Sequence, residues 1–418
     1  MAALSLCGCD NKESQPDPGG GSPSVGGTSS DGGTGGAVLG SGGTSEAGGA
    51  PAAGGTGTES GGSSAGGSAA GGAAAGGASG DGGAMGMSKT TFVYVGSGSF
   101  GAETGKVTVY RLDRQAPGLE FVSDTEAGGL ASFLAVDSER RRLYAADEVK
   151  GGVLSFTIDP TTGALTSLGA TPHSNHPVSL SISPDGKYLL GANYNEGNVD
   201  VYPIGDDGKA SASSQTVATG SHAHSVRFDQ EGKVLVANEG SDTISHLTFN
   251  GGMLSAATPP TSASFSPRHL AFHPNGTVFV VSERGDFITA YSRAENGSLN
   301  QIWQKPRLDS GQPTANTGAD IHLTPDGRTL YASNRGQSNT IVMYDIRGAE
   351  PVLLGHVSTR GTTPRNFAVD PEGQFLLVGN HGDQKTLALF RIESDGKLTE
   401  VKVEPMQVSP FFVTFVQF

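Results

Sequence analysis

The stretch SPRHLAFHPNGTVFVVSERG, Ser266–Gly285, contains the pattern that decides the fold. Two apolar segments flank a Pro-Asn-Gly turn, which is typical of a β-hairpin whose strands are both buried. Charged residues stand at both ends of the hairpin, with Arg268 and His269 near its start and Glu283 and Arg284 near its end. Because the two ends of a hairpin lie side by side, we expect these charges to meet in space.

The same pattern recurs along the chain at a regular spacing. Related segments are Ala131–Glu148, Pro177–Tyr194, Ala223–Gly240, Gly318–Arg335 and Pro364–His381. The turn glycines Gly186, Gly232, Gly276, Gly327 and Gly373 are separated by 46, 44, 51 and 46 residues. Weaker strands follow the hairpins, such as Gly197–Ile204, and no convincing helical segment appears. Four strands repeated at this period predict β-propeller blades.

A seventh unit is divided between the two ends of this region. Pro410–Phe418 matches only the first strand of the unit, Thr90–Ser99 only the second, and Gly105–Asp113 the third. Sharing one blade between the termini closes the ring and leaves no open sheet edge. We therefore predict an all-β, seven-bladed β-propeller of four-stranded antiparallel blades. A solenoid is the alternative, which the divided unit disfavours.

The segment before the propeller has a different composition. Of the 418 residues, residues 10–89 form a low-complexity linker rich in Gly, Ala and Ser, which we expect to be a disordered tether, and residues 90–418 form the propeller. The two cysteines, Cys7 and Cys9, both precede the linker, so the propeller cannot depend on disulfides or thiolate metal sites. The net charge of −14 disfavours nonspecific nucleic-acid binding.

Residues 1–9 resemble the end of a bacterial lipoprotein signal, with Cys9 as the lipidated residue. A chance cysteine is the alternative. No segment reaches the roughly 20 apolar residues of a spanning helix, so membrane contact is expected only through this anchor. The expected location is the bacterial cell envelope, or the cytoplasm if the signal interpretation is wrong.

Polar residues that differ between blades are better candidates for function than residues that recur in every blade. At the start of the first strand the aligned residues are Ser132, Val178, His224, Arg268, Ala319, Arg365 and Phe411, followed by Phe133, Ser179, Ser225, His269, Asp320, Asn366 and Phe412. At the end of the second strand we align Ser97, Asp147, Asn193, Asn238, Glu283, Asn334 and Asn380, followed by Gly98, Glu148, Tyr194, Glu239, Arg284, Arg335 and His381. Both sets are expected at one mouth of the central channel.

The residues at this mouth predict a site for an anionic or strongly polarised ligand. Arg268, Arg335 and Arg365 suit carboxylate, phosphate or carbonyl recognition, while His224 or Glu283 can accept a proton. Fixed cations beside a base suit attack of water on an activated acyl centre. A structural ion pair between Glu283 and either Arg268 or Arg335 is the alternative for those residues.

The repeated asparagines Asn193, Asn238, Asn334 and Asn380 are best interpreted as a turn-capping habit of the fold. Oxygen ligands of this kind can also hold calcium, but several arginines at the same mouth would repel a cation. We therefore expect neither a metal nor a cofactor.

At these residues the sequence resembles the seven-bladed propeller lactonase family, which includes propeller-type 6-phosphogluconolactonases and fungal carboxy-muconate lactonising enzymes. The resemblance covers Thr91–Phe418 and rests on the segments His222–Asp229, Pro267–Gly276, Ala319–Arg335 and Thr363–Pro371. It implies a metal-free site in which the family's histidine, glutamate and arginines fall on His224, Glu283, Arg268 and Arg335. The family's proline before the His-Ala-His motif is replaced by Ser221.

The sequence therefore predicts hydrolysis of a lactone, with an anionic small molecule as the expected substrate and a monomer as the expected state. Substrate contacts are expected from Arg365, His269, Asp320, Asn366, His222 and Asn193. The tether weakens the assignment to 6-phosphogluconolactone, because that substrate is cytosolic. A non-catalytic surface propeller that binds an anionic glycan or a protein partner is the alternative.

Overall fold

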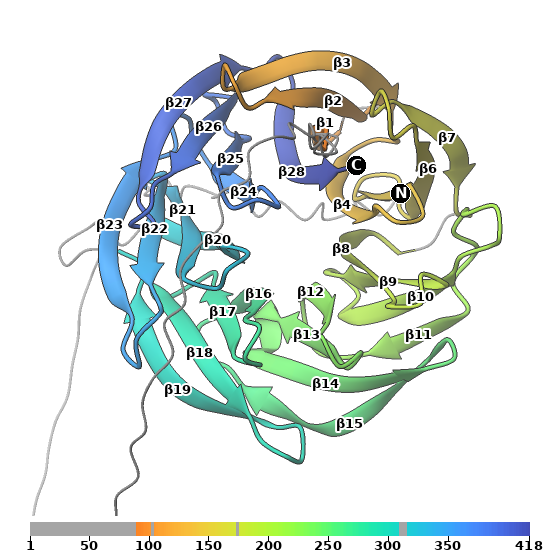
Figure 1. Ribbon diagram of the computed structural model, residues 1–418. Coiled ribbons are helices and arrows are strands. Elements are labelled where there is room, and N and C mark those ends of the chain that lie inside the picture. Colours follow the sequence, from red (N-terminus) through yellow and green to blue (C-terminus); the bar gives the residue numbers. More distant parts are fainter. Residues whose placement is uncertain (1–88, 102–103, 173–174, 309–315) are drawn as a thin grey trace, which may run out of the picture. The chain divides into compact units, whose positions relative to one another are not determined.

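Seven four-stranded antiparallel sheets make up the fold of the computed structural model, which describes residues 89–101, 104–172, 175–308 and 316–418. The sheets surround a central axis as the blades of a propeller (Figure 1). The prediction of an all-β, seven-bladed propeller is confirmed. Cys9 and the predicted linker lie outside the described residues. No helix in the described ranges is long and apolar enough to cross a membrane.

Blades 1 to 6 follow one another along the chain, each with its first strand nearest the axis. Blade 1 comprises β4 (Ala131–Asp137), β5 (Arg142–Asp147), β6 (Val153–Ile158) and β7 (Leu165–Ala170). Blade 2 comprises β8 (Pro177–Ile182), β9 (Tyr188–Asn193), β10 (Asn198–Pro203) and β11 (Gln215–Ala218). Blade 3 comprises β12 (Ala223–Phe228), β13 (Val234–Asn238), β14 (Thr243–Asn250) and β15 (Met253–Ser262), with a 3-10 turn at Glu239–Ser241.

The next three blades repeat this order. Blade 4 comprises β16 (Pro267–Phe272), β17 (Val278–Ser282), β18 (Phe287–Arg293) and β19 (Leu299–Pro306). Blade 5 comprises β20 (Asn316–Leu323), β21 (Thr329–Gly336), β22 (Thr340–Asp345) and β23 (Val352–Ser358). Blade 6 comprises β24 (Pro364–Val369), β25 (Phe375–Asn380), β26 (Thr386–Ile392) and β27 (Leu398–Pro405).

Blade 7 joins the two ends of the propeller region, as the divided repeat predicts. It comprises β28 (Ser409–Gln417), β1 (Thr91–Gly98), β2 (Lys106–Asp113) and β3 (Gly118–Glu126). The innermost strand β28 pairs antiparallel with β1, and Val93 lies opposite Phe415. This closure satisfies the edge of β1 with a strand from the other end of the sequence.

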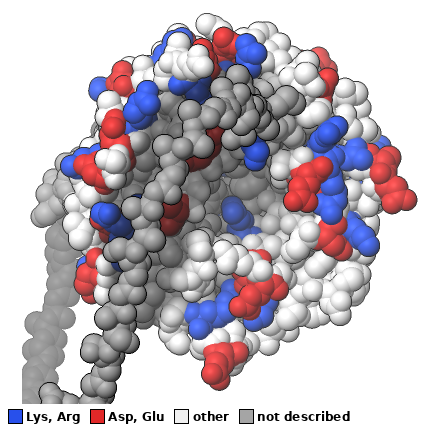
Figure 2. Space-filling model, viewed as in Figure 1, with Lys and Arg blue, Asp and Glu red and all other residues white. Residues whose placement is uncertain are grey.

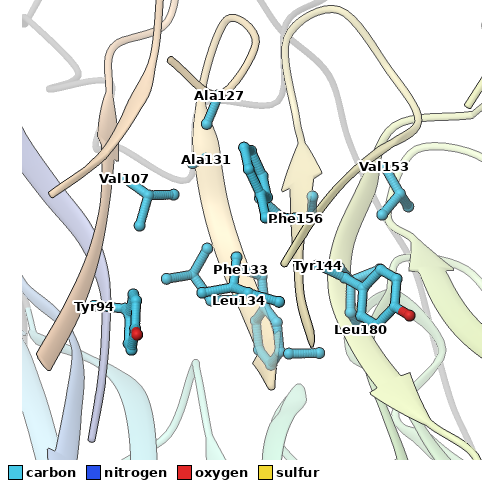
Figure 3. Close-up of a cluster of buried hydrophobic side chains, with 14 of the residues drawn as sticks. Tyr94, Val107, Ala127, Ala131, Phe133, Leu134, Tyr144, Val153, Phe156 and Leu180 are labelled. Carbon is cyan, nitrogen blue, oxygen red and sulfur yellow. The ribbon is translucent and has the colours of Figure 1, made fainter. Parts of the chain in front are cut away.

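Apolar side chains from neighbouring blades form the core between them. Figure 3 shows Tyr94 of blade 7 beside Phe133 and Phe156 of blade 1, with Leu180 of blade 2 beyond them. The Tyr94 hydroxyl donates a hydrogen bond of 2.8 Å to the carbonyl oxygen of Gly163 in the next blade. Such contacts hold each blade at a fixed angle to its neighbour, so the inner strands present their ends rigidly at the axis.

A β-bulge interrupts every inner hairpin near the same mouth of the channel. In six blades the pairing skips one residue of the first strand, namely Ser132, Val178, His224, Arg268, Arg365 and Phe411. In blade 5 the register shifts over Ala319 and Asp320. A bulge turns the extra side chain away from the regular pleat. The fold therefore offers one re-aimed side chain per blade at this mouth.

Candidate active site

Strand pairing corrects the position of Glu283 in the blade alignment. Ser282 pairs with Pro267, as Asn238 pairs with Ala223 in blade 3, so Ser282 is the residue equivalent to the repeated asparagines. The alignment made from sequence was wrong by one residue because β17 has five residues, whereas β9 and β25 have six. Glu283 instead shares its position with Glu148, Tyr194, Glu239, Arg335 and His381.

Three of the bulged residues carry a histidine or arginine side chain, and each follows a backbone in the left-handed region. His222, Ser266 and Thr363 have φ values of 56°, 59° and 55°, and each stands two residues before His224, Arg268 or Arg365. Residues other than glycine rarely adopt this conformation. Among the described residues, a non-glycine residue of positive φ stands two residues before the bulge in these three blades alone, so we connect it with the placement of those side chains.

The carboxylate of Glu283 lies between two buried arginines. Its Oε2 is 2.8 Å from Nε of Arg268 in the same blade, and its Oε1 is 2.7 Å from Nη2 of Arg335 in blade 5. All three side chains are at most 8% exposed. Burial raises the pKa of Glu283, but Arg335 and Arg268 lower it further, and the net pKa lies below its ordinary value. The carboxylate is therefore ionised, and the triad as a whole carries one positive charge.

Arg335 keeps hydrogen-bond donors available inside this mouth. Its Nη2 donates to the carbonyl oxygen of Gly318 at 3.0 Å, but Nε and Nη1 have no hydrogen-bond partner among the described residues. Since unpaired buried donors are costly, these two groups are suited to an oxygen of a bound ligand.

His224 is the other buried group with unused hydrogen-bonding capacity. It is 1% exposed, and neither Nδ1 nor Nε2 has a hydrogen-bond partner among the described residues. Burial, followed by the charge of Arg268, holds the pKa of His224 well below its ordinary value. A side-chain nitrogen of His224 lies within 4.8 Å of carboxylate oxygens of Glu239 and Glu283. The imidazole is thus neutral, with a lone pair available beside the triad.

A hydrogen-bonded layer lies directly below these groups and involves three of the predicted substrate contacts. His269 Nδ1 lies 2.6 Å from Asp320 Oδ1, and its Nε2 lies 3.3 Å from Arg268 Nη1. This arrangement fits a neutral imidazole that donates through Nδ1 and accepts at Nε2, and burial lowers the pKa of His269 to about 4. Asn366 donates to the other oxygen of Asp320. Asp320 and Asn366 therefore join the inner strands of blades 4, 5 and 6.

Aromatic rings complete the floor and walls of the mouth. Phe133 packs on Phe412 with 4.3 Å between ring centroids. His222 stacks on Tyr194 at 4.3 Å and 4°, and its ring is partly exposed at the rim. His381 stacks on Phe411 at 4.6 Å, and the Arg365 guanidinium lies 5.4 Å from the same Phe411 ring.

The Arg365 side chain contacts a residue of another blade, whereas the Asn193 amide is hydrogen-bonded within its own blade. Arg365 Nη2 lies 3.4 Å from Glu148 Oε2, across blade 7, with both side chains buried. Asn193 donates from Nδ2 to Asn198 Oδ1 at 2.7 Å and to Asp200 Oδ2 at 3.0 Å, within its own blade. The amide of Asn193 is thus engaged in the turn-capping pattern that its repetition indicates.

Sequence reasoning placed Glu239 and Glu148 at this mouth but did not single them out as candidate functional residues. Both are buried, at 2% and 6% exposed, in the position that they share with Glu283. The correct strand register alone would have shown acids at this position in three of the seven blades. The ion pair between Glu283 and Arg268 or Arg335 was an alternative that the sequence offered, and the structure contains both pairs. The pairing of Glu148 with Arg365 has no signal in the sequence, because it depends on how separate blades meet.

His224, Glu239 and Glu283 form a group whose donor atoms could in principle hold a metal ion. Both oxygens of Glu283, however, already face guanidinium groups. A cation placed there would have to displace or oppose two arginine charges, so this donor set fits a polarised oxygen better than a metal.

Comparisons with known proteins agree with this architecture. Residues 92–415 match the family model of the lactonases with a 7-bladed beta-propeller. A 6-phosphogluconolactonase of Formosa agariphila is 29% identical over 325 residues, which are 71% of this chain and 92% of that protein. One from Yersinia pestis is 29% identical over 336 residues, 77% of this chain and 97% of that protein.

A solved structure with the same fold comes from the periplasm. The periplasmic gluconolactonase PpgL of Pseudomonas aeruginosa superimposes with a TM-score of 0.72 at 26% identity, covering 79% of this chain and 99% of that chain. The prediction of a lactonase-type enzyme with a small-molecule lactone as substrate is thereby confirmed at the level of the family. The chain belongs to the lactonase family of seven-bladed β-propellers.

Proposed function

We propose that this chain hydrolyses a sugar lactone at the mouth that carries His224, Glu283, Arg268 and Arg335, without a bound metal. The observation that carries the proposal is a neutral, buried His224 within 4.8 Å of a carboxylate that two arginines hold. Neither ring nitrogen of His224 has a hydrogen-bond partner in the part of the chain that the structure describes. The names of the relatives support the substrate class, since they include 6-phosphogluconolactonases and a gluconolactonase.

His224 acts as the general base in this proposal. It takes a proton from water while the water oxygen forms a bond to the lactone carbonyl carbon. Arg335 donates from Nε and Nη1 to the carbonyl oxygen, where negative charge develops. The tetrahedral intermediate then breaks its ring C–O bond, and the proton returns from His224 to the ring oxygen. One water is consumed, and the product is the open hydroxy acid.

Glu283 positions the two arginines rather than accepting the proton. Its lowered pKa makes it a weak base, and both of its oxygens are already engaged. Holding Arg268 and Arg335 at fixed places keeps their donors oriented before the oxyanion forms, so no reorganisation is needed during the reaction.

A turnover assay on the purified full-length chain tests this proposal. The protein is expected to open sugar δ-lactones in a pH-stat, equally well before and after treatment with a chelator, and His224→Gln is expected to lose most of that activity. Activity that a chelator removes and calcium restores would overturn the metal-free assignment. Unaltered turnover in His224→Gln would overturn the assignment of the base, and binding without turnover would favour the surface-binding alternative.

We also propose that the enzyme acts in the cell envelope, anchored through a lipid on Cys9. The periplasmic origin of one structural relative supports this location. Expression of the native gene, followed by membrane fractionation, tests it. Cys9→Ser is expected to move the protein from the membrane fraction to the soluble envelope fraction, whereas Cys7→Ser is expected to leave it in place. An unchanged distribution for Cys9→Ser would contradict the anchor.

A further inference from the structure

The buried charges of the mouth nearly cancel. Three buried arginines reach it, Arg268, Arg335 and Arg365, and three buried glutamates accompany them, Glu148, Glu239 and Glu283. Asp147 adds a fourth buried acid, and its carboxylate accepts hydrogen bonds from the backbone N–H groups of the loops beside it. The buried part of the mouth therefore offers no excess of positive charge.

Two further cations, Arg307 and Arg227, add little to the charge of the mouth. Arg307 is fully buried behind the mouth and donates to the carbonyl oxygen of Gly285, with Asp286 3.5 Å away. Arg227 lies three residues beyond His224 on β12, and its charge faces the carboxylate of Asp320. Between residues 89 and 418 the structure leaves 102–103, 173–174 and 309–315 undescribed, and these residues include neither lysine nor arginine.

Exposed cations among the described residues near the mouth include Arg284 and Lys150. Arg284 is 72% exposed and 3.6 Å from Glu239, and Lys150 is exposed in blade 1. Cations in contact with water bind an anion weakly, because solvent screens the attraction. Figure 2 shows basic side chains in the central hollow of the ring, but those of the described mouth are matched by buried carboxylates.

A phosphate ester makes a demand that this mouth does not meet. It carries a charge between about −1.5 and −2 at neutral pH and needs charge-assisted hydrogen bonds to be removed from water. Here each glutamate would repel it, and the charge of Arg365 is already opposed by Glu148 at 3.4 Å. Burying an uncompensated dianion beside three carboxylates is strongly unfavourable.

The aromatic walls fit a different kind of ligand. The Tyr194–His222 pair and the Phe411–His381 pair present flat rings, and Tyr194 lies edge-on to His224 with 5.6 Å between the centroids. Pockets that combine aromatic walls with a few placed polar groups suit small ligands of low charge. Hydroxyl groups can meet the donors of Arg335 without adding net charge.

We infer that the substrate is an uncharged, unphosphorylated sugar lactone, because the glutamates of the mouth neutralise the arginines that a phosphate would need. This inference rests on the proposed lactonase function and narrows its substrate class. One positive charge remains on the triad of Arg268, Glu283 and Arg335, and it matches the single negative charge of the developing oxyanion.

Kinetics with a matched pair of substrates tests the inference. Full-length protein is assayed with glucono-1,5-lactone and with its 6-phosphate at equal ionic strength. We expect kcat/KM to be at least 10-fold higher for the unphosphorylated lactone and nearly independent of salt. A 10-fold preference for the phosphorylated lactone, or a kcat/KM that falls steeply with salt, would overturn the inference.

A binding measurement separates this inference from the proposed function. Calorimetry with gluconolactam and its 6-phosphate, which resist hydrolysis, reports the charge preference even if neither lactone is turned over. Absent turnover with tighter binding of the uncharged lactam would contradict the lactonase function alone. Tighter binding of the phosphorylated lactam would contradict the inference alone.

A variant that removes one buried negative charge tests the same substrate preference. Glu148→Gln removes the carboxylate beside Arg365, so the ratio of kcat/KM for the phosphorylated to the unphosphorylated lactone is expected to rise at least 5-fold. Glu350→Gln makes the same change of charge on an exposed side chain paired with Lys305, away from the mouth, and should leave the ratio unchanged. An equal ratio in the two variants would contradict the role given to Glu148.

Discussion

The two ends of the inner hairpins differ in how they satisfy their charges. At the turn end the acids bind their own turn, as when Asp326 accepts hydrogen bonds from Thr324 Oγ1 and from the backbone N–H of Arg328. Two of them, Asp229 and Asp370, also pair with an arginine of the next blade. At the bulge end the partners come from different blades, as when Arg335 of blade 5 meets Glu283 of blade 4. The hydrogen bonds within each turn repeat with the fold, whereas the buried charges of several blades meet at one site at the bulge end.

Asp326 and Glu283 also differ in exposure, although other acids at the turn end, such as Asp370, are buried. Asp326 is 54% exposed, whereas Glu283 is 8% exposed between its two arginines. A surface hollow of about 360 Å³ does lie at the turn end, between blades 5 and 6, but charges that line it pair within their own turns, such as Arg347 with Asp345. The comparison teaches that a hollow alone does not indicate chemistry, and that buried groups with unused hydrogen-bonding capacity are the stronger sign.

Two variants that each remove one carboxylate, one at the bulge end and one at the turn end, should differ most in stability and activity. Glu283→Gln leaves two buried guanidinium groups uncompensated, so we expect a loss of about 3 kcal/mol in the free energy of unfolding and at least about 100-fold in kcat/KM. Urea unfolding and lactone turnover measure the two effects.

Asp326→Asn is the matched control at the turn end. It should cost about 1 kcal/mol or less, because it weakens exposed local hydrogen bonds, and it should keep full activity. Equal destabilisation by the two variants would remove the distinction between the ends.

Arg335→Lys should separate the charge of this residue from its donor geometry. The lysine can still compensate Glu283, but it lacks the Nε and Nη1 groups that we assign to the carbonyl oxygen. We expect kcat to fall by about 100-fold with little change in stability, as for the loss of an oxyanion donor. Arg328→Lys at the turn end should change neither quantity. A kcat within 3-fold of the native value in Arg335→Lys would show that charge alone suffices.

The pH dependence of stability should report the buried histidines of the mouth. Burial lowers the pKa of His269 to about 4 and holds those of His224 and His381 well below their ordinary values. Below pH 6.5 the unfolded chain therefore binds more protons than the folded chain, and stability falls as the pH falls. From His269 alone we expect a loss of about 2 kcal/mol between pH 8 and pH 5. Thermal unfolding across this range that shows no loss would contradict neutral histidines at the mouth.

The smallest expected effect concerns the strained backbone before Arg365. Thr363 is β-branched and has a φ of 55°, so Thr363→Gly should relieve strain and raise the free energy of unfolding by about 0.5 kcal/mol. The same change at Thr362, which is not among the residues of positive φ, should lower stability by a similar amount. If both variants are equally destabilised, the conformation at Thr363 carries no strain.

The repeat in the sequence was sufficient to predict the architecture, because turns, alternation and the divided seventh unit all reflect local chain geometry. The bulged residues His224, Arg268 and Arg365 could be found as blade-specific exceptions in an aligned position. The register of Glu283 could not be found by counting from the turn, since the second strands of blades 3 and 4 have five residues instead of six. Strand pairing decides that register.

The partners within the mouth required the folded ring. Glu148 and Arg365 are 217 residues apart and meet only because blade 7 closes the circle between blades 1 and 6. The sequence favoured an anionic substrate because it displays the arginines of the mouth as blade-specific exceptions. The buried glutamates that neutralise them become visible only in three dimensions, and they are what leads to the inference of an uncharged lactone.

The pH profile of lactone turnover tests the central claim most directly, namely that the neutral, buried His224 at the bulge end is the base. After subtraction of uncatalysed hydrolysis, kcat/KM of the native protein should stay constant from pH 7.5 down past 6.5 and decline only at lower pH, because the pKa of His224 lies well below its ordinary value. In His224→Gln the residual activity should be lower by roughly 10²- to 10⁴-fold and should lack this acid limb. An identical profile and similar kcat/KM in the two proteins would contradict the account.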